Sequence, residues 1–274
     1  MLFEICAFSV PKRDSTPLEN QDAVLPRGPR AHGRRHFPWS QRVASKNGRV
    51  IIGIADGATE GILSGEWANI TLKTLSKSKC EVRNEEDVVH LLSQAIATWK
   101  RFQRLRTLNG ARSLTALPKW LEDHSIDQGA FTTACVAWFG DDYSWIVASV
   151  GDSCVFQERH GKLISAWPLS LSSEFSNSPY LLGSQASNNR DLSAHIKVFR
   201  GNWEDSDHFY FATDALAFWI LKQHEQGNLP LRDLKQFSDG YPDEFSDFVA
   251  KSRESGEIRN DDTTLIRAQF TPDF

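Results

Sequence analysis

Aspartate side chains stand at five points of the sequence where an apolar, strand-like run meets a polar one. An Asp-Gly pair such as Asp56-Gly57 is by itself a common turn signal, because both residues tolerate a positive φ. Several carboxylates that converge from different strand ends would instead form a site for a cation. The five are Asp22, Asp56, Asp152, Asp214 and Asp261.

A divalent metal ion is the cation that this set of side chains favours. Like charges held together repel one another unless a cation compensates them, and few basic residues flank the five positions in the sequence. A hard ion with oxygen ligands is the natural compensation. The sequence has no His or Cys cluster with the spacing of a zinc site, which favours Mg²⁺ or Mn²⁺.

Apolar runs rich in β-branched and aromatic residues predict the strands that would position these aspartates. If residues 22–25 and 50–55 pair as an antiparallel hairpin, the start of the first strand lies beside the end of the second. That pairing would bring Asp22 and Asp56 together. The predicted strands with the clearest pattern are 3–9, 50–55, 131–139, 144–150, 208–213 and 263–269.

Helical spacing follows the strand that ends at Asp56. Two or three helices are expected up to about residue 126, and further helices near 214–225 and 241–254. Blocks of strands and blocks of helices favour a layered α+β fold over alternating βαβ units. The apolar stripes consist of Leu63, Trp67 and Ile70 in the first helix and Val88, Leu92, Ile96 and Trp99 in the second.

One domain over residues 1–274 is the simplest organisation, because the sequence shows no internal repeat and no convincing linker. The range 171–206 is polar, rich in Ser and Asn, and expected to be dominated by loops. The segment NSPYLLGSQ within it contains Tyr180, Leu181 and Leu182, which either anchor that region to the core or contact a substrate. The basic stretch at 27–36 is expected to be a solvated loop, with docking of a charged partner as the alternative.

Composition and charge match an ordinary globular protein, with 40% hydrophobic residues, 24% charged residues and a net charge of -4. That charge is too small to attract nucleic acid or a membrane surface over long range. No segment approaches the roughly 20 apolar residues of a membrane helix, and the N-terminal run resembles a strand more than a signal peptide. We therefore expect a soluble, cytoplasmic protein that binds neither nucleic acid nor membrane. The cysteines are expected to be reduced core residues: Cys6, Cys80, Cys135 and Cys154.

Seven short segments, taken in order, resemble the motifs of the metal-dependent Ser/Thr phosphatases of the protein phosphatase 2C type. They are ENQDAV, IIGIADG, SGEWAN, FTTACVAWF, SVGDSCVF, FYFATDAL and NDDTTLI, and the resemblance covers roughly residues 3–269. It implies a four-layer αββα sandwich of two antiparallel β-sheets flanked by helices. It also implies hydrolysis of phosphoserine or phosphothreonine in proteins by a metal-activated water. A phosphorylated protein is then the expected substrate, a cognate Ser/Thr kinase the expected partner, and a monomer the expected state.

The resemblance also implies roles for individual residues. Asp56 would bridge two Mn²⁺ or Mg²⁺ ions, and Asp214 and Asp261 would complete one of them. The Gly57 carbonyl and the region of Asp22 would serve the other ion. Asp56, Asp214 and Asp261 are therefore the candidate catalytic residues.

A third, weaker ion and a phosphate-holding arginine complete the expected site. Asp152 and Asp214 are the candidates for the third ion, and Arg13 is the candidate for holding phosphate, although its spacing to Asp22 is longer than usual in the family. The retained metal ligands favour an active enzyme. Four positions depart from the family pattern, and three of them, Gln21, Ala215 and Phe218, motivate the alternative of a catalytically weak or inactive module that binds a phosphorylated partner. The departures are Gln21 for Glu, Ala58 where some members have an acid-base His, Ala215 for Gly and Phe218 for Asp.

Overall fold

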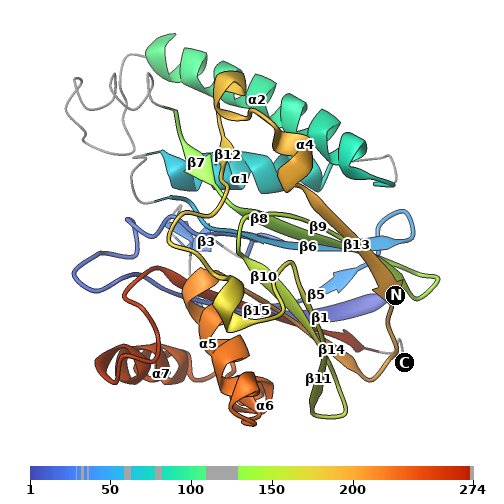
Figure 1. Ribbon diagram of the computed structural model, residues 1–274, viewed down its shortest axis with the longest axis vertical. Helices are drawn as coiled ribbons and strands as arrows, with labels where there is room; N and C mark the ends of the chain where they lie inside the picture. Colours follow the sequence, from blue (N-terminus) through green and yellow to red (C-terminus); the bar gives the residue numbers. More distant parts are fainter. Residues whose placement is uncertain are drawn as a thin grey trace.

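Two antiparallel sheets packed face to face form the centre of the structure, with helices over both outer faces (Figure 1). The computed structural model describes residues 1–28, 30–31, 34–35, 37–58, 63–77, 82–108 and 129–271. This arrangement confirms the predicted α+β sandwich in four layers.

One sheet has six strands and contains both the first and the last long strand of the chain. Its order is β11-β10-β14-β15-β1-β5, and its neighbouring strands pair antiparallel. β1 and β15 pair along their whole length, from Leu2 opposite Thr271 to Val10 opposite Thr263. The strands are β1 (Leu2–Val10), β5 (Trp39–Ala44), β10 (Cys154–Arg159), β11 (Lys162–Trp167), β14 (Asp207–Ala212) and β15 (Thr263–Thr271).

The other large sheet has five strands in the order β13-β9-β8-β6-β2. Two small two-stranded sheets, β12-β7 and β3-β4, lie outside the main layers. The five strands are β2 (Ala23–Leu25), β6 (Arg49–Ala55), β8 (Ala134–Gly140), β9 (Ser144–Val150) and β13 (Lys197–Asn202). The short strands are β3 (Arg30–Ala31), β4 (Arg34–Arg35), β7 (Phe131–Thr132) and β12 (Leu182–Gly183).

Helices form the two outer layers, and Figure 1 shows α1 and α2 over the five-stranded sheet and α5, α6 and α7 on the side of the six-stranded sheet. α1 and α2 confirm the two predicted amphipathic helices, and α5 and α7 confirm the predictions near 214–225 and 241–254. The third helix considered before residue 126 lies outside the described residues. The helices are α1 (Ser64–Leu75), α2 (Glu85–Leu108), α4 (Leu192–His195), α5 (Asp214–Glu225), α6 (Pro230–Lys235) and α7 (Pro242–Glu254), with 3₁₀ turns η1 (Ser172–Glu174) and η2 (Ala186–Asn188).

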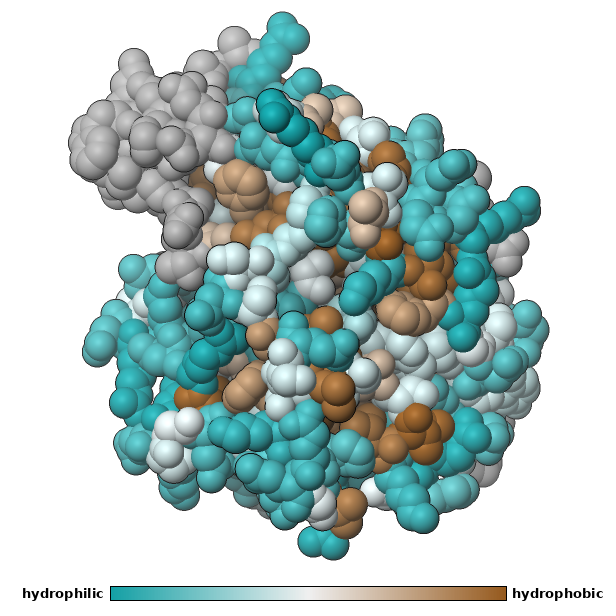
Figure 2. Space-filling view, viewed as in Figure 1, coloured by the Kyte–Doolittle hydropathy of each residue, from teal (hydrophilic) through white to brown (hydrophobic). Residues whose placement is uncertain are grey.

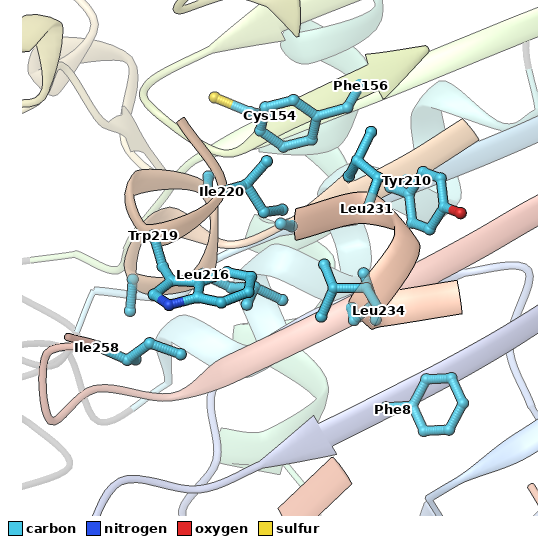
Figure 3. Close-up of a cluster of buried hydrophobic side chains, with 14 of the residues drawn as sticks. Phe8, Cys154, Phe156, Tyr210, Leu216, Trp219, Ile220, Leu231, Leu234 and Ile258 are labelled. Carbon is cyan, nitrogen blue, oxygen red and sulfur yellow. The ribbon is translucent and has the colours of Figure 1, made fainter. Parts of the chain in front are cut away.

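Separate apolar cores hold the layers together. Side chains such as Phe3, Phe139 and Phe209 fill the space between the two sheets. A second core lies between the six-stranded sheet and its helices, where α5 directs Leu216 and Ile220 toward the strands (Figure 3). A third joins α1 and α2 to the outer face of the five-stranded sheet. Since each sheet is covered on both faces, its central strands consist of nearly continuous apolar runs.

Besides the three-residue β2, four strands of the large sheets were not among the runs with the clearest pattern, and burial explains why. β5, β11 and β13 are edge strands with many exposed or half-buried positions, so they have no continuous apolar run. β10 is central but contains the buried polar residues Gln157 and Glu158. Periodicity of apolar residues alone does not reveal strands of either kind.

The predicted strand 131–139 is in fact two strands. β7 pairs with β12, whereas β8 pairs with β6 and β9. Between them the Thr133 amide donates a hydrogen bond to the Asp56 carbonyl at 2.8 Å. The chain therefore changes pairing partner at the point where it contacts Asp56.

The connection between β2 and β6 is longer than the single hairpin loop that the sequence suggested. β2 does pair antiparallel with β6, but the chain between them also forms the β3-β4 hairpin and then β5, which pairs with β1 in the other sheet. Most of the basic stretch 27–36 lies outside the residues whose side chains are described. In the range 171–206, β13 replaces the expected loop at the C-terminal end.

Three of the cysteines, Cys6, Cys135 and Cys154, are buried free thiols, as predicted, and Cys80 lies outside the described residues. No helix in the described ranges has the length and hydropathy needed to cross a membrane. In Figure 2 the visible face is mostly hydrophilic, and apolar residues form separate patches.

Candidate metal centre

Asp22 and Asp56 lie at the same end of one pair of strands. Asp22 immediately precedes β2 and Asp56 immediately follows β6, and Ala23 is in register with Ala55. The two strands run antiparallel, so the start of one adjoins the end of the other. Asp22 is buried, with 3% of its surface exposed, and Asp56 is partly buried.

The other three predicted ligands come from the opposite sheet and from the turn between β9 and β10. Asp214 is the first residue of α5, directly after β14, and Asp261 lies just before β15. β14 pairs with β15, and the Thr213 amide donates to the Thr264 carbonyl at 3.2 Å, so these two ends are adjacent. Asp152 follows β9 and is buried.

The electrostatics of Asp56 indicate that the other four aspartates lie near it. Burial raises the pKa of the Asp56 carboxyl well above its usual range, and the charges of Asp22, Asp214, Asp261 and Asp152 raise it further. A carboxyl whose pKa is raised by four neighbouring carboxylates is typical of a site where acidic residues from several segments converge. The structure thus brings together the five aspartates that the sequence singled out.

The neighbouring carboxyls are perturbed in the same direction. Burial raises the pKa of Asp22 well above its usual range, with the charge of Asp262 as the next cause. Burial also raises the pKa of Asp152 to about 7, with a further contribution from Asp214. The pKa of Asp214 is raised by burial, although the positive charge of Arg259 opposes the rise. Ionisation of these buried carboxyls is therefore unfavourable, and a bound cation would offset the repulsion between them.

Oxygen donors dominate the site, which suits Mg²⁺ or Mn²⁺ better than a softer metal. Within the described ranges, no three His, Cys, Asp or Glu side chains already have the spacing of ligands around one ion, so an ion would have to draw the carboxylates closer. Gln21 adds a further oxygen: among the described residues, its buried Oε1 has no hydrogen-bond partner. An amide oxygen in that state is suited to accept a hydrogen bond from a metal-bound water. The residues present therefore fit a hard divalent ion.

Two threonines of the β7-β8 junction hold the backbone of Asp56. The Asp56 amide donates to Thr133 Oγ1 at 2.9 Å, and Thr132 Oγ1 donates to the Asp56 carbonyl at 2.8 Å. Thr133 Oγ1 is also hydrogen-bonded to Ser153 Oγ at 2.7 Å, next to Asp152. These buried hydroxyls link the loops that carry Asp56 and Asp152. The sequence offered only the motif FTT as a signal for them.

A second hydroxyl lies behind Asp22. Thr213 Oγ1 donates to Asp22 Oδ2 at 3.2 Å and accepts a hydrogen bond from the Thr264 amide at 3.0 Å. Since Thr213 directly precedes Asp214, this contact connects the two sheets at the acidic end. Asp22 and Asp214 are thereby positioned relative to each other.

Gly57 has a steric reason to be glycine. A Cβ there would lie 2.8 Å from the Gln21 carbonyl oxygen and 2.8 Å from a backbone atom of Ser64. Any larger residue would push the Asp56 loop away from the Gln21–Asp22 segment. The close approach of two backbone segments therefore requires glycine after Asp56, in addition to any need of the turn for glycine.

Asp262 is a buried acidic residue that sequence reasoning missed as a site residue. Its Oδ1 accepts a hydrogen bond from the Lys12 amide at 2.9 Å, and its Oδ2 accepts one from the Gln21 amide at 2.8 Å. Burial raises its pKa. Asp262 therefore fastens both ends of the segment that carries Arg13 to the start of β15.

Arg13, the predicted phosphate-holding residue, has its guanidinium beside α7. Arg13 Nη2 lies 4.0 Å from Glu254 Oε1, at the last residue of that helix, and its amide donates to Asn260 Oδ1 at 2.7 Å. Arg259, which the sequence did not single out, instead donates from Nη2 to Asp214 Oδ2 at 2.7 Å. In the described part of the chain, Arg259 thus contacts the carboxylate of a predicted metal ligand, whereas Arg253 donates from Nη2 to the backbone carbonyl of another, Asp261.

Two of the departures from the family pattern have packing roles. Ala215 is buried in the core at the start of α5. Phe218, one turn further along, packs edge-on against Phe175 with ring centroids 5.8 Å apart. An aromatic contact therefore occupies the position at which the family resemblance implied a carboxylate for a third ion.

Comparison with known proteins gives the class. The family model of protein phosphatase 2C matches residues 39–264, so the chain belongs to the protein phosphatase 2C family. Members of this class are protein serine/threonine phosphatases. No curated protein sequence matches the chain.

Solved structures show the same fold at low sequence identity. The Mycobacterium tuberculosis serine/threonine phosphatase PstP/Ppp has a TM-score of 0.59 and 11% identity, covering 99% of this chain and 100% of that chain. The catalytic domain of PstP in complex with two manganese ions has a TM-score of 0.57 and 10% identity, covering 98% and 99%. The photosystem II phosphatase PBCP has a TM-score of 0.56 and 15% identity, also covering 98% and 99%.

Proposed function

We propose that this protein hydrolyses phosphoserine and phosphothreonine in proteins and that it requires Mn²⁺ or Mg²⁺, with two ions in the working site. The observation that supports this most directly is Asp56, whose pKa is raised by burial and then by four other aspartates. Such a concentration of negative charge is unfavourable without cations and favourable with them. A complex of PstP with two manganese ions supports the same metal class for this chain.

The ligands proposed for the ions are those that the structure gathers. Asp56 would bridge them, Asp214 and Asp261 would complete one, and Asp22 with the Gly57 carbonyl would serve the other. When bound, the ions would lower the pKa of a coordinated water and would stabilise negative charge on the phosphoryl oxygens. No covalent bond between enzyme and phosphate is needed.

The chain's own part in catalysis is to hold these carboxylates in place before substrate arrives. The backbone of Asp56 is bonded on both sides by Thr132 and Thr133, and Asp22 is bonded by Thr213. These hydrogen bonds limit how far the carboxylates must rearrange when the ions bind and the transition state forms. Gln21 Oε1 is available to orient a water in this site.

Protonation of the leaving alcohol would come from water. Ala58 stands where some members of the family have an acid-base histidine, and a methyl side chain has no proton to give. A phosphoryl-transfer transition state spreads negative charge over the equatorial oxygens, where cations stabilise it, and a water can supply the proton that the leaving oxygen needs. The missing histidine is therefore compatible with turnover.

A catalytically inactive binding module is the less favoured alternative. It is motivated by Gln21, Ala215 and Phe218, but the proposed ligands Asp56, Asp214 and Asp261 are all retained. The packing of Phe218 against Phe175 affects only the position of a third ion, so we propose that a third ion binds weakly. The two-ion centre does not depend on it.

The proposed setting is the cytoplasm, with a phosphorylated protein as substrate and a kinase acting in the opposite direction. Buried free thiols at Cys6, Cys135 and Cys154 support a reducing compartment. Membership of a family that acts on phosphoproteins supports the substrate class.

The test is hydrolysis of para-nitrophenyl phosphate and of a phosphothreonine peptide with Mn²⁺, Mg²⁺ or EDTA. Asp214→Asn should abolish metal-dependent turnover, whereas Asp243→Asn, which changes an exposed carboxylate on α7, should leave it unchanged. No turnover with any metal, from protein shown to be folded, would overturn the proposal. Phosphopeptide binding by such a protein would point to the inactive module.

A further inference from the structure

We propose that Arg259 is a phosphate-binding residue of this site, one that holds the phosphoryl group of the substrate from the side of Asp214. The inference rests on the proposed phosphatase function and adds a residue to it. Arg259 donates from Nη2 to Asp214 Oδ2 at 2.7 Å. It therefore places a permanent positive charge against a carboxylate of the metal centre.

The contact places Arg259 beside two of the five aspartates. Its guanidinium donates to Asp214 at the start of α5, and its backbone lies two residues before Asp261, next to β15, which pairs with β14. A phosphoryl group bound to the metal centre would therefore lie near a positive charge.

The backbone of Arg259 is held firmly on both sides. The preceding residue, Ile258, is 2% exposed and packs in the core below α5. The Asp261 amide donates to the Arg259 carbonyl at 3.0 Å, which closes a tight turn just before β15. Arg259 and the proposed ligand Asp261 therefore belong to one hydrogen-bonded turn.

The side chain of Arg259 keeps donors for a ligand. It is 46% exposed, whereas Asp214 is 14% exposed, so the guanidinium lies on the solvent side of the carboxylate. A guanidinium has five N–H donors in a planar fork that matches the oxygens of a phosphate group. One donor bonded to Asp214 orients the fork and leaves others for phosphoryl oxygens. Asp214 Oδ1 accepts from the Ala215 amide, and a carboxylate retains further lone pairs for a metal ion.

Two other arginines near this end of the molecule are engaged differently. Arg253 donates to the Pro11 carbonyl at 2.8 Å and to Thr263 Oγ1 at 2.9 Å, so it fastens backbone segments. Arg13 has its guanidinium 4.0 Å from Glu254. Arg259 is the one of the three that contacts a carboxylate of the proposed metal centre, which makes it the better placed of them to reach a bound phosphate.

The experiment measures phosphate affinity directly as well as turnover. The comparison includes wild type and three variants: Arg259→Ala, Arg259→Lys and Arg13→Ala. The control is Arg104→Ala, which removes one positive charge from the exposed face of α2. For each protein, Mn²⁺ affinity is determined by calorimetry first. Inorganic phosphate is then titrated calorimetrically at saturating Mn²⁺, and its competitive inhibition of para-nitrophenyl phosphate hydrolysis is measured under the same conditions.

Arg259→Ala should weaken phosphate binding and raise KM by roughly 10- to 100-fold, the size of one or two lost charge-assisted hydrogen bonds. Arg259→Lys should recover part of the loss because it keeps the charge but not the fork. Arg104→Ala should match wild type. The inference is overturned if Arg259→Ala binds phosphate like wild type at saturating Mn²⁺, or if its only defect is in Mn²⁺ affinity.

Failure of the phosphatase proposal gives a different result. In that case wild type shows no turnover, and the calorimetric phosphate affinity still decides about Arg259. A wild-type protein that binds no phosphate would overturn the inference, while selective loss of phosphate binding in Arg259→Ala would support it in a non-catalytic protein.

Discussion

Asp22 and Asp56 flank the β2-β6 pair at the same end, because Ala23 lies opposite Ala55 in the antiparallel register. Both carboxyls have pKa values raised well above the usual range, by burial first and by neighbouring aspartates second. The β2-β6 pair thus places two carboxyls where ionisation of either one is unfavourable without a compensating positive charge.

Asp56→Asn should stabilise the protein without metal and remove its response to metal. A neutral amide avoids both the burial cost and the repulsion that raise the pKa of Asp56, so the unfolding midpoint in EDTA should rise by about 2–4 °C for each kcal/mol gained. Hydrolysis should fall by about 100-fold or more because the proposed bridging ligand is lost. Thermal unfolding in EDTA and in Mn²⁺ checks both parts. A variant that is still stabilised by Mn²⁺ as strongly as wild type would contradict the ligand role.

Thr133→Val should destabilise the protein while preserving the shape of the side chain. It removes the acceptor for the Asp56 amide and the partner of Ser153 Oγ, both in a buried setting. Loss of such bonds costs about 1–3 kcal/mol of unfolding free energy, measured in urea. Thr98→Val on the exposed face of α2 is the control and should change stability by about 0.5 kcal/mol or less. Equal effects of the two substitutions would show that the Thr133 hydroxyl does not hold Asp56.

Asp262→Ala should loosen the segment that carries Arg13. The amides of Lys12 and Gln21 would lose their carboxylate acceptor, and their hydrogen exchange should accelerate by about 10-fold or more. Asp262→Asn keeps one acceptor oxygen and should give a smaller effect. The amide of Ala7, within β1, is the internal reference. Unchanged exchange at Lys12 and Gln21 would contradict the role of Asp262.

His208 should make the protein less stable as the pH falls below about 6.5. Burial lowers the pKa of His208, and the charge of Lys235, whose Nζ lies 3.0 Å from His208 Nε2, lowers it further. Below the unfolded pKa of about 6.5 the unfolded chain therefore binds more protons than the folded one, so stability rises with pH through this window. The slope from this residue is at most about 1.4 kcal/mol per pH unit.

His208→Gln isolates that contribution. Urea unfolding at several pH values between 5 and 8 should show a weaker loss of stability at low pH in the variant than in wild type, whatever the acidic site contributes to both. Parallel pH profiles of the two proteins would show that His208 titrates alike in the folded and unfolded states.

Much of the candidate site was predictable because its aspartates adjoin strands, several of which have strong local signals. Two apolar runs end abruptly in an acid: VIIGIA before Asp56 and FYFAT before Asp214. A buried strand that runs into an exposed loop produces this pattern within a few consecutive residues. The helices from 64 to 75 and from 85 to 108 were predicted from their apolar stripes. Such features depend on residues that are neighbours in sequence, so the sequence alone reveals them.

Other features depend on contacts between distant segments, and only the tertiary structure decided them. β5 joins the far edge of the other sheet, and β10 buries Gln157 and Glu158, so neither has a recognisable apolar pattern. Asp262 and Thr133 act on backbone amides far away in sequence. The choice of Arg259 over Arg13 as the basic side chain at Asp214 depends on how the α7-β15 turn packs beside the start of α5. The amino-acid types thus determined that carboxylates would collect at strand ends, whereas packing of the two sheets decided which side chains hold and neutralise them.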